Sequence, residues 1–93
     1  MTFRLVYHPA VESHDLPALD AHARSRIELA LEERVATRPA AFGKALRGTL
    51  KGLWSIRVGD QRIIYTIAGD EVYVLLIGHR REAYREARRR FDG

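Results

Sequence analysis

Two arginines on facing strand positions give the first indication of chemistry in this sequence. The segment 51–65 reads as two short strands joined by a tight Gly-Asp turn. A two-residue turn of this kind sets Arg57 directly against Arg62, and it places Trp54 against Tyr65 on the other face. Like charges on directly opposed positions destabilise a sheet by roughly 0.2–1 kcal/mol. A bound anion such as a phosphate would relieve this repulsion, so the pair predicts an anion-binding site.

A histidine is expected near the same arginines. A second Gly-Asp turn leads into a strand predicted over residues 72–78. With two residues in that turn as well, Arg62 faces Ile77, and His79 lies diagonally near Arg62. The side chains of Arg57, Arg62 and His79 are therefore expected to cluster at one end of a sheet.

The elements that must position these residues follow from hydrophobic periodicity and turn signals. In chain order they are a strand at 3–7, helices at 10–19 and 21–37 with Asp20 as N-cap of the second, a short strand around 45–47, the strands described above, and a helix within 80–91. Antiparallel strands joined by tight turns need no crossover helix, so this order predicts an α+β fold rather than alternating βαβ units. We expect a single domain over residues 1–93.

Basic residues are concentrated in the second half of the chain. Residues 1–41 carry five Arg and six acidic residues, net −1, whereas residues 42–93 carry eleven Lys or Arg and six acidic residues, net +5. The second half is therefore expected to face a polyanion. Within it, the arginine run 88–90 is interpreted as a solvated helix face that complements the helix dipole.

Composition excludes several kinds of site. The chain has no cysteine, which rules out a disulfide framework and a thiol nucleophile. His8, His14 and His22 have no metal-binding spacing, and we expect no metal or other cofactor. The longest apolar runs are far shorter than the ~20 residues of a membrane span, and no signal peptide is recognisable. A soluble protein of the cytoplasm is expected.

Several motifs carry a resemblance to a known family. The most specific are Arg-Val-Gly-Asp-Gln-Arg-Ile-Ile-Tyr at 57–65 and Ile-Gly-His-Arg-Arg-Glu-Ala-Tyr at 77–84, with Phe-Gly-Lys-Ala-Leu-Arg-Gly at 42–48 and His-Pro at 8–9 in support. With these motifs, nearly the whole chain resembles the RelE/ParE family of bacterial toxins from type II toxin–antitoxin operons. The resemblance implies a small twisted antiparallel sheet with an N-terminal helical hairpin and a C-terminal helix.

The resemblance also implies roles for individual residues. Family members that resemble RelE cleave mRNA in the ribosomal A site, whereas ParE-like members poison DNA gyrase and lack the RNase residues. This chain looks closer to the first group. Arg62 falls on the arginine that stabilises the scissile phosphate, Arg80 or Arg81 on a second such arginine, and Tyr84 on a tyrosine with an acid/base or stacking role. The further candidates for binding RNA or phosphate are Arg47, Lys51, Ser55, Arg57 and Arg85.

Ser55 is the main departure from the family pattern, because RelE-like members usually have Lys or Arg there. RNA cleavage by the neighbouring 2′-OH needs a base for that hydroxyl, cations for the phosphate charge and an acid for the leaving oxygen. Arginine suits only the second role, since it stays charged. The titratable candidates that remain are His79, Tyr84 and Lys51. Of these, only His79 ordinarily titrates near neutral pH.

The sequence thus predicts an mRNA-cleaving endoribonuclease toxin that a cognate antitoxin neutralises. The alternatives are a ParE-like gyrase-directed or otherwise non-nucleolytic toxin, and a catalytically degenerate toxin kept for antitoxin binding. Tyr84 together with Arg62 and Arg80 or Arg81 favours the ribonuclease, while Ser55 counts toward the degenerate toxin. The expected partners are the antitoxin, mRNA and the ribosome, and operator DNA through the antitoxin complex, with no membrane.

Overall fold

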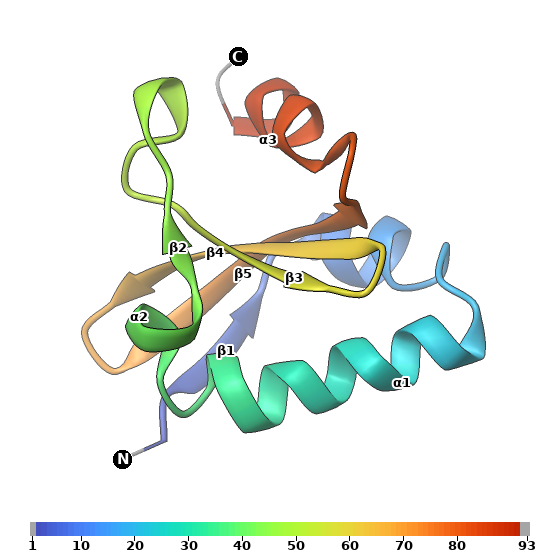
Figure 1. The fold of residues 1–93 in the computed structure, drawn as a ribbon, viewed down its shortest axis with the longest axis horizontal. Helices are drawn as coiled ribbons and strands as arrows, with labels where there is room; N and C mark the ends of the chain where they lie inside the picture. The colour runs from blue at the N-terminus through green and yellow to red at the C-terminus, as the bar shows by residue number, and fades with distance from the viewer. Residues whose placement is uncertain (1, 92–93) are drawn as a thin grey trace.

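The structure is a computed structural model that describes residues 2–91, built around one five-stranded sheet (Figure 1). Its strands are β1 (Arg4–Tyr7), β2 (Lys44–Ala45), β3 (Trp54–Val58), β4 (Gln61–Ala68) and β5 (Glu71–His79). Its helices are α1 (Ala21–Ala30), α2 (Pro39–Phe42) and α3 (Ala83–Phe91). Three short helical segments complete it: the π-helical η1 (Val11–Asp15) and η2 (Leu31–Val35), and the 3-10 turn η3 (Gly48–Leu50).

The strands are arranged in the order β1-β5-β4-β3-β2. From β2 to β5, strands that follow one another in the chain are antiparallel neighbours. β1 pairs with β5 in parallel, with Arg4 against Glu71 at one end and Tyr7 against Val74 at the other. The predicted α+β class is confirmed, although the sheet is mixed rather than wholly antiparallel. A parallel pair is possible here because all the intervening elements serve as the long crossover that parallel strands require.

Helices lie on both faces of the sheet (Figure 1). On one face, α1 and the segments beside it enclose a core that contains the fully buried residues Val11, Ile27, Val35, Ile63, Tyr65, Val72 and Val74. On the other face, α3 covers a smaller core of Leu50, Ile64, Leu76, Ala83 and Ala87. Because side chains alternate along a strand, Arg62 shares the face of Ile64, which is the α3 face.

The β3–β4 hairpin has the register that its turn predicts. Trp54 pairs with Tyr65, and Arg57 pairs with Arg62. Gly59 in the turn has φ 62°, a left-handed conformation that suits glycine. Turn length fixes the pairing of a hairpin, which is why the short local sequence was sufficient.

The β4–β5 pair departs from its predicted register. Next to the turn the prediction holds, but a bulge between Ile64 and Tyr65 shifts the pairing by one residue beyond it. Arg62 therefore faces Gly78, and the predicted pairing with Ile77 is wrong. A bulge inserts one extra residue into one strand, and no turn signal in the sequence marks it.

The helices differ from prediction mainly at their ends. Asp20 caps α1 as predicted, with its Oδ1 accepting a 2.8 Å hydrogen bond from the Ala23 backbone N–H. The helix predicted over 10–19 is reduced to η1, the one predicted over 21–37 ends at Val35, and β2 lies at 44–45 rather than 45–47. The short helix α2 was not predicted and begins at Pro39, a residue well suited to a first helical position. Within residues 2–91, no helix is long and apolar enough to cross a membrane.

Candidate functional site

Arg62, Tyr84 and Ser55 meet on the α3 face of the sheet. The guanidinium carbon of Arg62 lies 4.9 Å from the centroid of the Tyr84 ring, a cation–π contact. The Oγ of Ser55 accepts long hydrogen bonds from the Tyr84 hydroxyl at 3.4 Å and from Arg62 Nη1 at 3.5 Å. Ser55 itself is buried. These three residues form one contiguous group, called here the Arg62–Tyr84 centre.

Two strands and a helix hold this centre together. Arg62 is the second residue of β4, and Ser55 lies on the adjacent β3. Tyr84 is in the first turn of α3, which packs against the sheet through the fully buried Ala83 and Ala87. Alanines at these positions let the helix backbone approach the strands closely. The phenol is thereby held within reach of both strand residues.

Hydrogen bonds direct the two facing arginines to different acceptors. Arg57 Nε donates to the Gly59 carbonyl at 2.8 Å, and Arg62 Nε donates to the Arg80 carbonyl at 3.3 Å. Neither guanidinium forms an ion pair with an acid in the part of the chain that the structure describes. Each keeps N–H donors that an anion can accept from.

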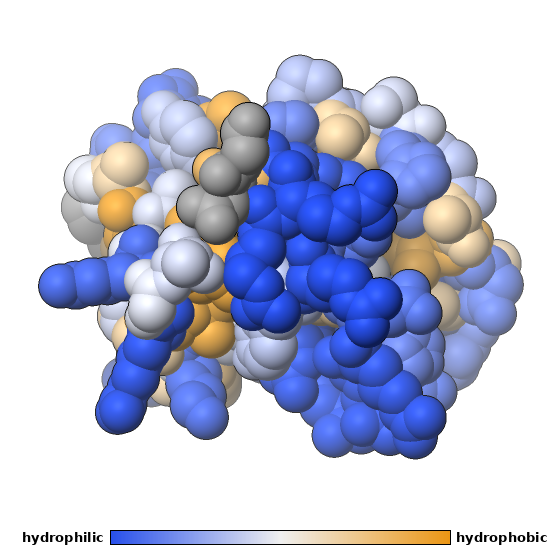
Figure 2. All heavy atoms as spheres, turned by 90° about the horizontal axis from the view of Figure 1, so that it is seen from above, coloured by the Kyte–Doolittle hydropathy of each residue, from blue (hydrophilic) through white to orange (hydrophobic). Residues whose placement is uncertain are grey.

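A hollow of about 660 Å³ opens beside Tyr84, toward β2 and η3. It is lined by Lys44, Ala45, Leu46, Arg47, Leu50, Tyr84 and Arg88, and is called here the β2 hollow. Figure 2, seen from the α3 side, shows hydrophilic side chains gathered over α3, with hydrophobic atoms between them and the hydrophilic side chains over β2 and η3. The lining contains three cations and no acid. Across residues 2–91, none of those three cations is in an ion pair.

The two predicted arginines after β5 take different positions. The backbone N–H of Arg80 donates to the Asp60 carbonyl at 2.7 Å, and its Nε lies 3.8 Å from Asp60 Oδ1, which ties Arg80 to the β3–β4 turn. Arg81 is exposed, and its backbone N–H donates to His79 Nδ1 at 3.2 Å. It is the carbonyl of Arg80, rather than its guanidinium, that hydrogen-bonds to Arg62.

The predicted cluster of His79 with Arg57 and Arg62 is wrong. His79 pairs with Gln61, the residue before Arg62, so alternation puts its side chain on the opposite face of the sheet. It lines a second hollow, of about 580 Å³, that also includes Asp15. The β4–β5 bulge is the cause, because a one-residue shift moves every following side chain to the other face.

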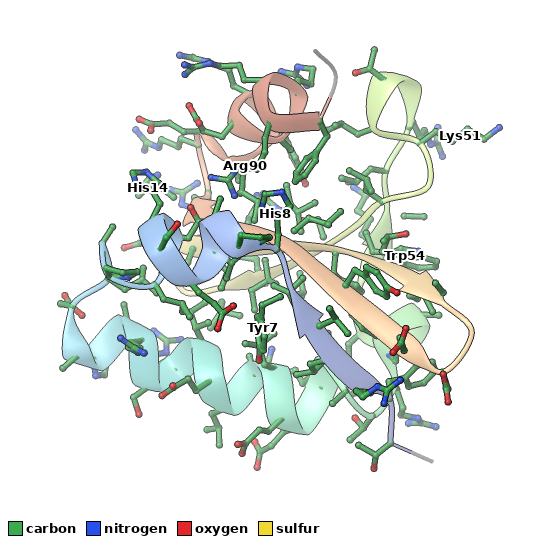
Figure 3. The ribbon with its side chains drawn as sticks, turned by 180° about the vertical axis from the view of Figure 1, so that it is seen from behind. Tyr7, His8, His14, Lys51, Trp54 and Arg90 are labelled. Carbon is green, nitrogen blue, oxygen red and sulfur yellow. The ribbon has the colours of Figure 1, made fainter. Side chains whose placement is uncertain are left out.

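Four of the predicted phosphate ligands line neither hollow: Lys51, Ser55, Arg57 and Arg85. Ser55 and Arg57 still lie on the sheet face of Arg62 through the β3–β4 pairing, whereas Lys51 and Arg85 are outside the sheet. Lys51 follows η3, and its side chain points into solvent (Figure 3). Arg85 is exposed and comes one residue after Tyr84, so it projects from a different side of α3. Arg47, in contrast, lines the β2 hollow with Tyr84. We therefore leave Lys51 and Arg85 out of the site.

A protein-family model matches residues 3–84, and it describes the ParE toxin of the type II toxin–antitoxin system parDE. The match covers most of the chain. The chain belongs to this toxin family. Curated proteins gave no significant match.

The fold of the toxin is similar to that of solved RelE proteins. The RelBE2 toxin–antitoxin complex of Mycobacterium tuberculosis is 24% identical with a TM-score of 0.80, over 86% of this chain and 93% of that one. A mutant of Escherichia coli RelE in the free state is 23% identical with a TM-score of 0.74, over 98% and 99%. The RelB–RelE complex of Methanococcus jannaschii is 25% identical with a TM-score of 0.69, over 87% and 96%. The RelE-like fold expected from the sequence is confirmed.

Sequence reasoning missed three functional candidates in this toxin. Lys44 lies outside the strand predicted at 45–47, so its pairing with Ser55 was not foreseen. Arg88 lies four residues after Tyr84, a spacing that places both on one helix face and could have been used. Arg90, which belongs to the run interpreted as solvated, instead forms an ion pair with the buried Asp15.

Proposed function

We propose that this toxin is an endoribonuclease that cleaves mRNA, and that a cognate antitoxin holds it inactive. The observation that carries the proposal is the contact of the Arg62 guanidinium with the Tyr84 ring, 4.9 Å from carbon to centroid. A permanent cation beside a phenol meets two needs of phosphodiester cleavage, which are stabilisation of the developing charge and transfer of a proton.

In the proposed reaction the 2′-oxygen of a ribose attacks the adjacent phosphorus. The new 2′-O–P bond forms while the P–O5′ bond breaks, leaving a 2′,3′-cyclic phosphate and a free 5′-hydroxyl. The proton of the 2′-OH leaves to a base, and the 5′-oxygen takes a proton from an acid. Arg62 stabilises the negative charge on the phosphate oxygens, with Arg57 on the facing strand position adding to the field. Tyr84 is the proposed partner for proton transfer.

The make-up of the centre supports cleavage on the ribosome rather than on free RNA. Arg62, Tyr84 and Ser55 include no imidazole, because His79 lies on the other face of the sheet. With no side chain that ordinarily titrates near neutral pH, the reaction must depend strongly on how the 2′-oxygen and phosphorus are aligned. A ribosome holding mRNA in its A site would supply this alignment.

The proposal is tested by incubating the purified toxin with a translated mRNA, with and without ribosomes, and mapping the new 5′ ends. We expect cuts within codons that require the ribosome, and 5′-hydroxyl termini at each cut. Arg24→Ala, on the exposed surface of α1, serves as a control that cuts like the parent. A pure parent toxin that leaves mRNA intact under both conditions would show that the chain is not a ribonuclease.

A gyrase-directed toxin is the second candidate, because the matching family model is that of ParE. In that case the arginines around Tyr84 would bind a protein partner. A supercoiling assay with purified DNA gyrase separates the two functions. Inhibition of gyrase with no mRNA cleavage would favour the ParE-like activity, while loss of both activities with antitoxin binding intact would indicate a degenerate toxin.

The proposed antitoxin contact is electrostatic. Two of the similar solved structures are toxin–antitoxin complexes, and residues 42–93 of this chain carry eleven basic and six acidic residues, net +5. An acidic antitoxin segment would be attracted to this half and would shield Arg57 and Arg62. The association rate should fall steeply with added salt. A rate independent of ionic strength would point to apolar recognition at α1 instead.

A further inference from the structure

We propose that the β2 hollow is a subsite for the RNA backbone next to the scissile phosphate, with Lys44 and Arg88 as phosphate ligands. The inference rests on the proposed action on RNA and adds to it a specific path for the strand. It is carried by three features of the described residues: the pairing of Lys44 with Ser55, the spacing of Arg88 from Tyr84, and the charge of the lining.

Lys44 belongs to the reaction face through its strand register. It pairs directly with Ser55, so the two side chains rise from the same face with Cβ atoms roughly 5 Å apart. Ser55 is small and buried beneath Arg62 and Tyr84. Lys44 is exposed and has a long flexible side chain, so its ammonium group can extend over the short side chain of Ser55. The cationic charge that position 55 of β3 lacks is thus available from Lys44 on β2.

Arg88 reaches the same space from the helix. It lies one helical turn after Tyr84 in α3, and both residues line the β2 hollow. With Arg47 on the far side, three cations surround an opening with leucine in its wall and no acid. Within residues 2–91 all three lack an ion-pair partner, so their charges are uncompensated by the protein.

The second hollow is a useful contrast. Its lining includes Asp15, Glu82 and Glu86 together with basic residues, and Arg89 and Arg90 are ion-paired there. A polyanion gains little from a lining whose charges are already balanced. The single sign of the β2 hollow, and its direct contact with Tyr84, select it as the path of the backbone.

Both residues also have a possible role without RNA. Lysine on an edge strand such as β2 discourages pairing with another chain. Arginine in the last turn of a helix complements the helix dipole. Neither of these roles involves release of counterions from RNA, so the salt dependence of RNA binding separates them from the proposed contact.

The experiment measures binding of a fully 2′-O-methylated single-stranded oligonucleotide, which cannot be cleaved by 2′-OH attack, over a range of salt concentrations. Lys44→Gln and Arg88→Gln should each weaken binding at low salt by about tenfold, and each should reduce the slope of log K against log salt by about 0.7. Lys44→Arg should keep the parental slope. The matched controls are Lys51→Gln, the only other lysine, and Arg89→Gln, the next residue of α3. Both should bind like the parent.

The outcomes separate this inference from the proposed cleavage. If the parent binds the oligonucleotide and cleaves mRNA, but Lys44→Gln and Arg88→Gln keep the parental slope, the subsite is overturned and the ribonuclease stands. If both variants lose slope and the parent cleaves nothing, the subsite stands and cleavage falls. A parent that does not bind single-stranded RNA would overturn the subsite, while the ribosome-dependent cleavage would still be decided by its own assay.

Discussion

The guanidinium of Arg90 and the carboxylate of Asp15 form a two-pronged ion pair between opposite ends of the chain. Nη1 lies 2.9 Å from Oδ2, and Nη2 lies 3.1 Å from Oδ1. The same Oδ2 accepts the Ile77 backbone N–H at 3.0 Å, and Arg90 Nη1 also donates to the Leu75 carbonyl at 3.0 Å. In Figure 3, Arg90 points from α3 toward the η1 segment. This contact fixes α3, and with it Tyr84, against β5 and η1.

Arg90→Gln should therefore destabilise the fold and reduce activity together. Removing one partner of a buried ion pair leaves an uncompensated charge, here the carboxylate of Asp15, at a cost of about 3 kcal/mol. Denaturant unfolding measures the loss. The control is Arg89→Gln, which breaks only the exposed pair with Glu86 and should change stability by less than about 0.5 kcal/mol. Equal free energies of unfolding for Arg90→Gln and Arg89→Gln would mean that the Arg90–Asp15 ion pair does not stabilise the fold.

Arg62→Ala should abolish cleavage and leave the fold intact. Arg62 is half-buried and contributes to the centre rather than to either core, so its loss removes only the proposed contact to the phosphate. One such donor is worth about 10²–10³ in rate. Circular dichroism checks the fold, and Arg24→Ala on α1 is the control for loss of a surface arginine. A folded Arg62→Ala toxin that still arrests growth would remove Arg62 from the reaction.

His79→Gln should cut mRNA as fast as the parent, because the β4–β5 bulge places His79 away from Arg62.

Tyr84→Phe should be strongly impaired in mRNA cleavage. It keeps the ring beside Arg62 but loses the hydroxyl that reaches Ser55 Oγ. Comparison with Tyr84→Ala then separates proton transfer from ring contact, since equal losses in Phe and Ala assign the effect to the hydroxyl. A nearly inactive His79→Gln with active Tyr84→Phe would reverse the assignment.

Local signals predicted the parts of the site that lie within one hairpin. The facing of Arg57 and Arg62 follows from a two-residue turn, and it is confirmed. The register of β5 against β4 beyond its turn could not be predicted from local signals. The bulge between Ile64 and Tyr65 shifts the β4–β5 pairing by one residue, and this shift moved His79 from the predicted cluster.

The ends of α3 show the same limit. Helical spacing places Ala83 and Ala87 on one side of α3, and both are fully buried. It gave no reason to separate Arg90 from its neighbours in the arginine run. The partner of Arg90 is Asp15, which is 75 residues away in the sequence, and only the folded arrangement brings the two charges together.

Alkaline pH should destabilise the toxin through Tyr65. Burial raises the pKa of the Tyr65 phenol from 10.0 to about 12. Between these values the unfolded chain loses the proton while the folded one keeps it, so this contribution to stability is complete below pH 10 and is lost as the pH rises toward 12. The total is on the order of 3 kcal/mol. Unfolding free energies measured across this window should fall less steeply in Tyr65→Phe. Identical pH slopes in the parent and in Tyr65→Phe would show that folding does not raise the pKa of the Tyr65 phenol.

Gly43 and Tyr65 should be energetically coupled. A Cβ built at Gly43 would overlap the Tyr65 hydroxyl and would also lie 2.9 Å from the Pro39 carbonyl oxygen. The backbone at Gly43, with φ −88°, is open to any residue, so close approach is what requires glycine here. Gly43→Ala should therefore cost roughly 1–3 kcal/mol by overpacking. Tyr65→Phe should cost about 0.5–1.5 kcal/mol, because its hydroxyl donates a 2.7 Å hydrogen bond to the Pro39 carbonyl.

In the double variant the overlap of the new methyl group with the Tyr65 hydroxyl is removed, so the two losses should not add. We expect a coupling of at least about 0.5 kcal/mol in a double-mutant cycle of unfolding free energies. Relief should be partial, since the 2.9 Å approaches to the Pro39 carbonyl oxygen and to the ring carbon Cζ of residue 65 persist. Strictly additive losses would mean that the helix α2 shifts to admit the methyl group without pressing on Tyr65. A coupled pair would show that Gly43 and the Tyr65 hydroxyl pack directly against each other, immediately before the start of β2 at Lys44.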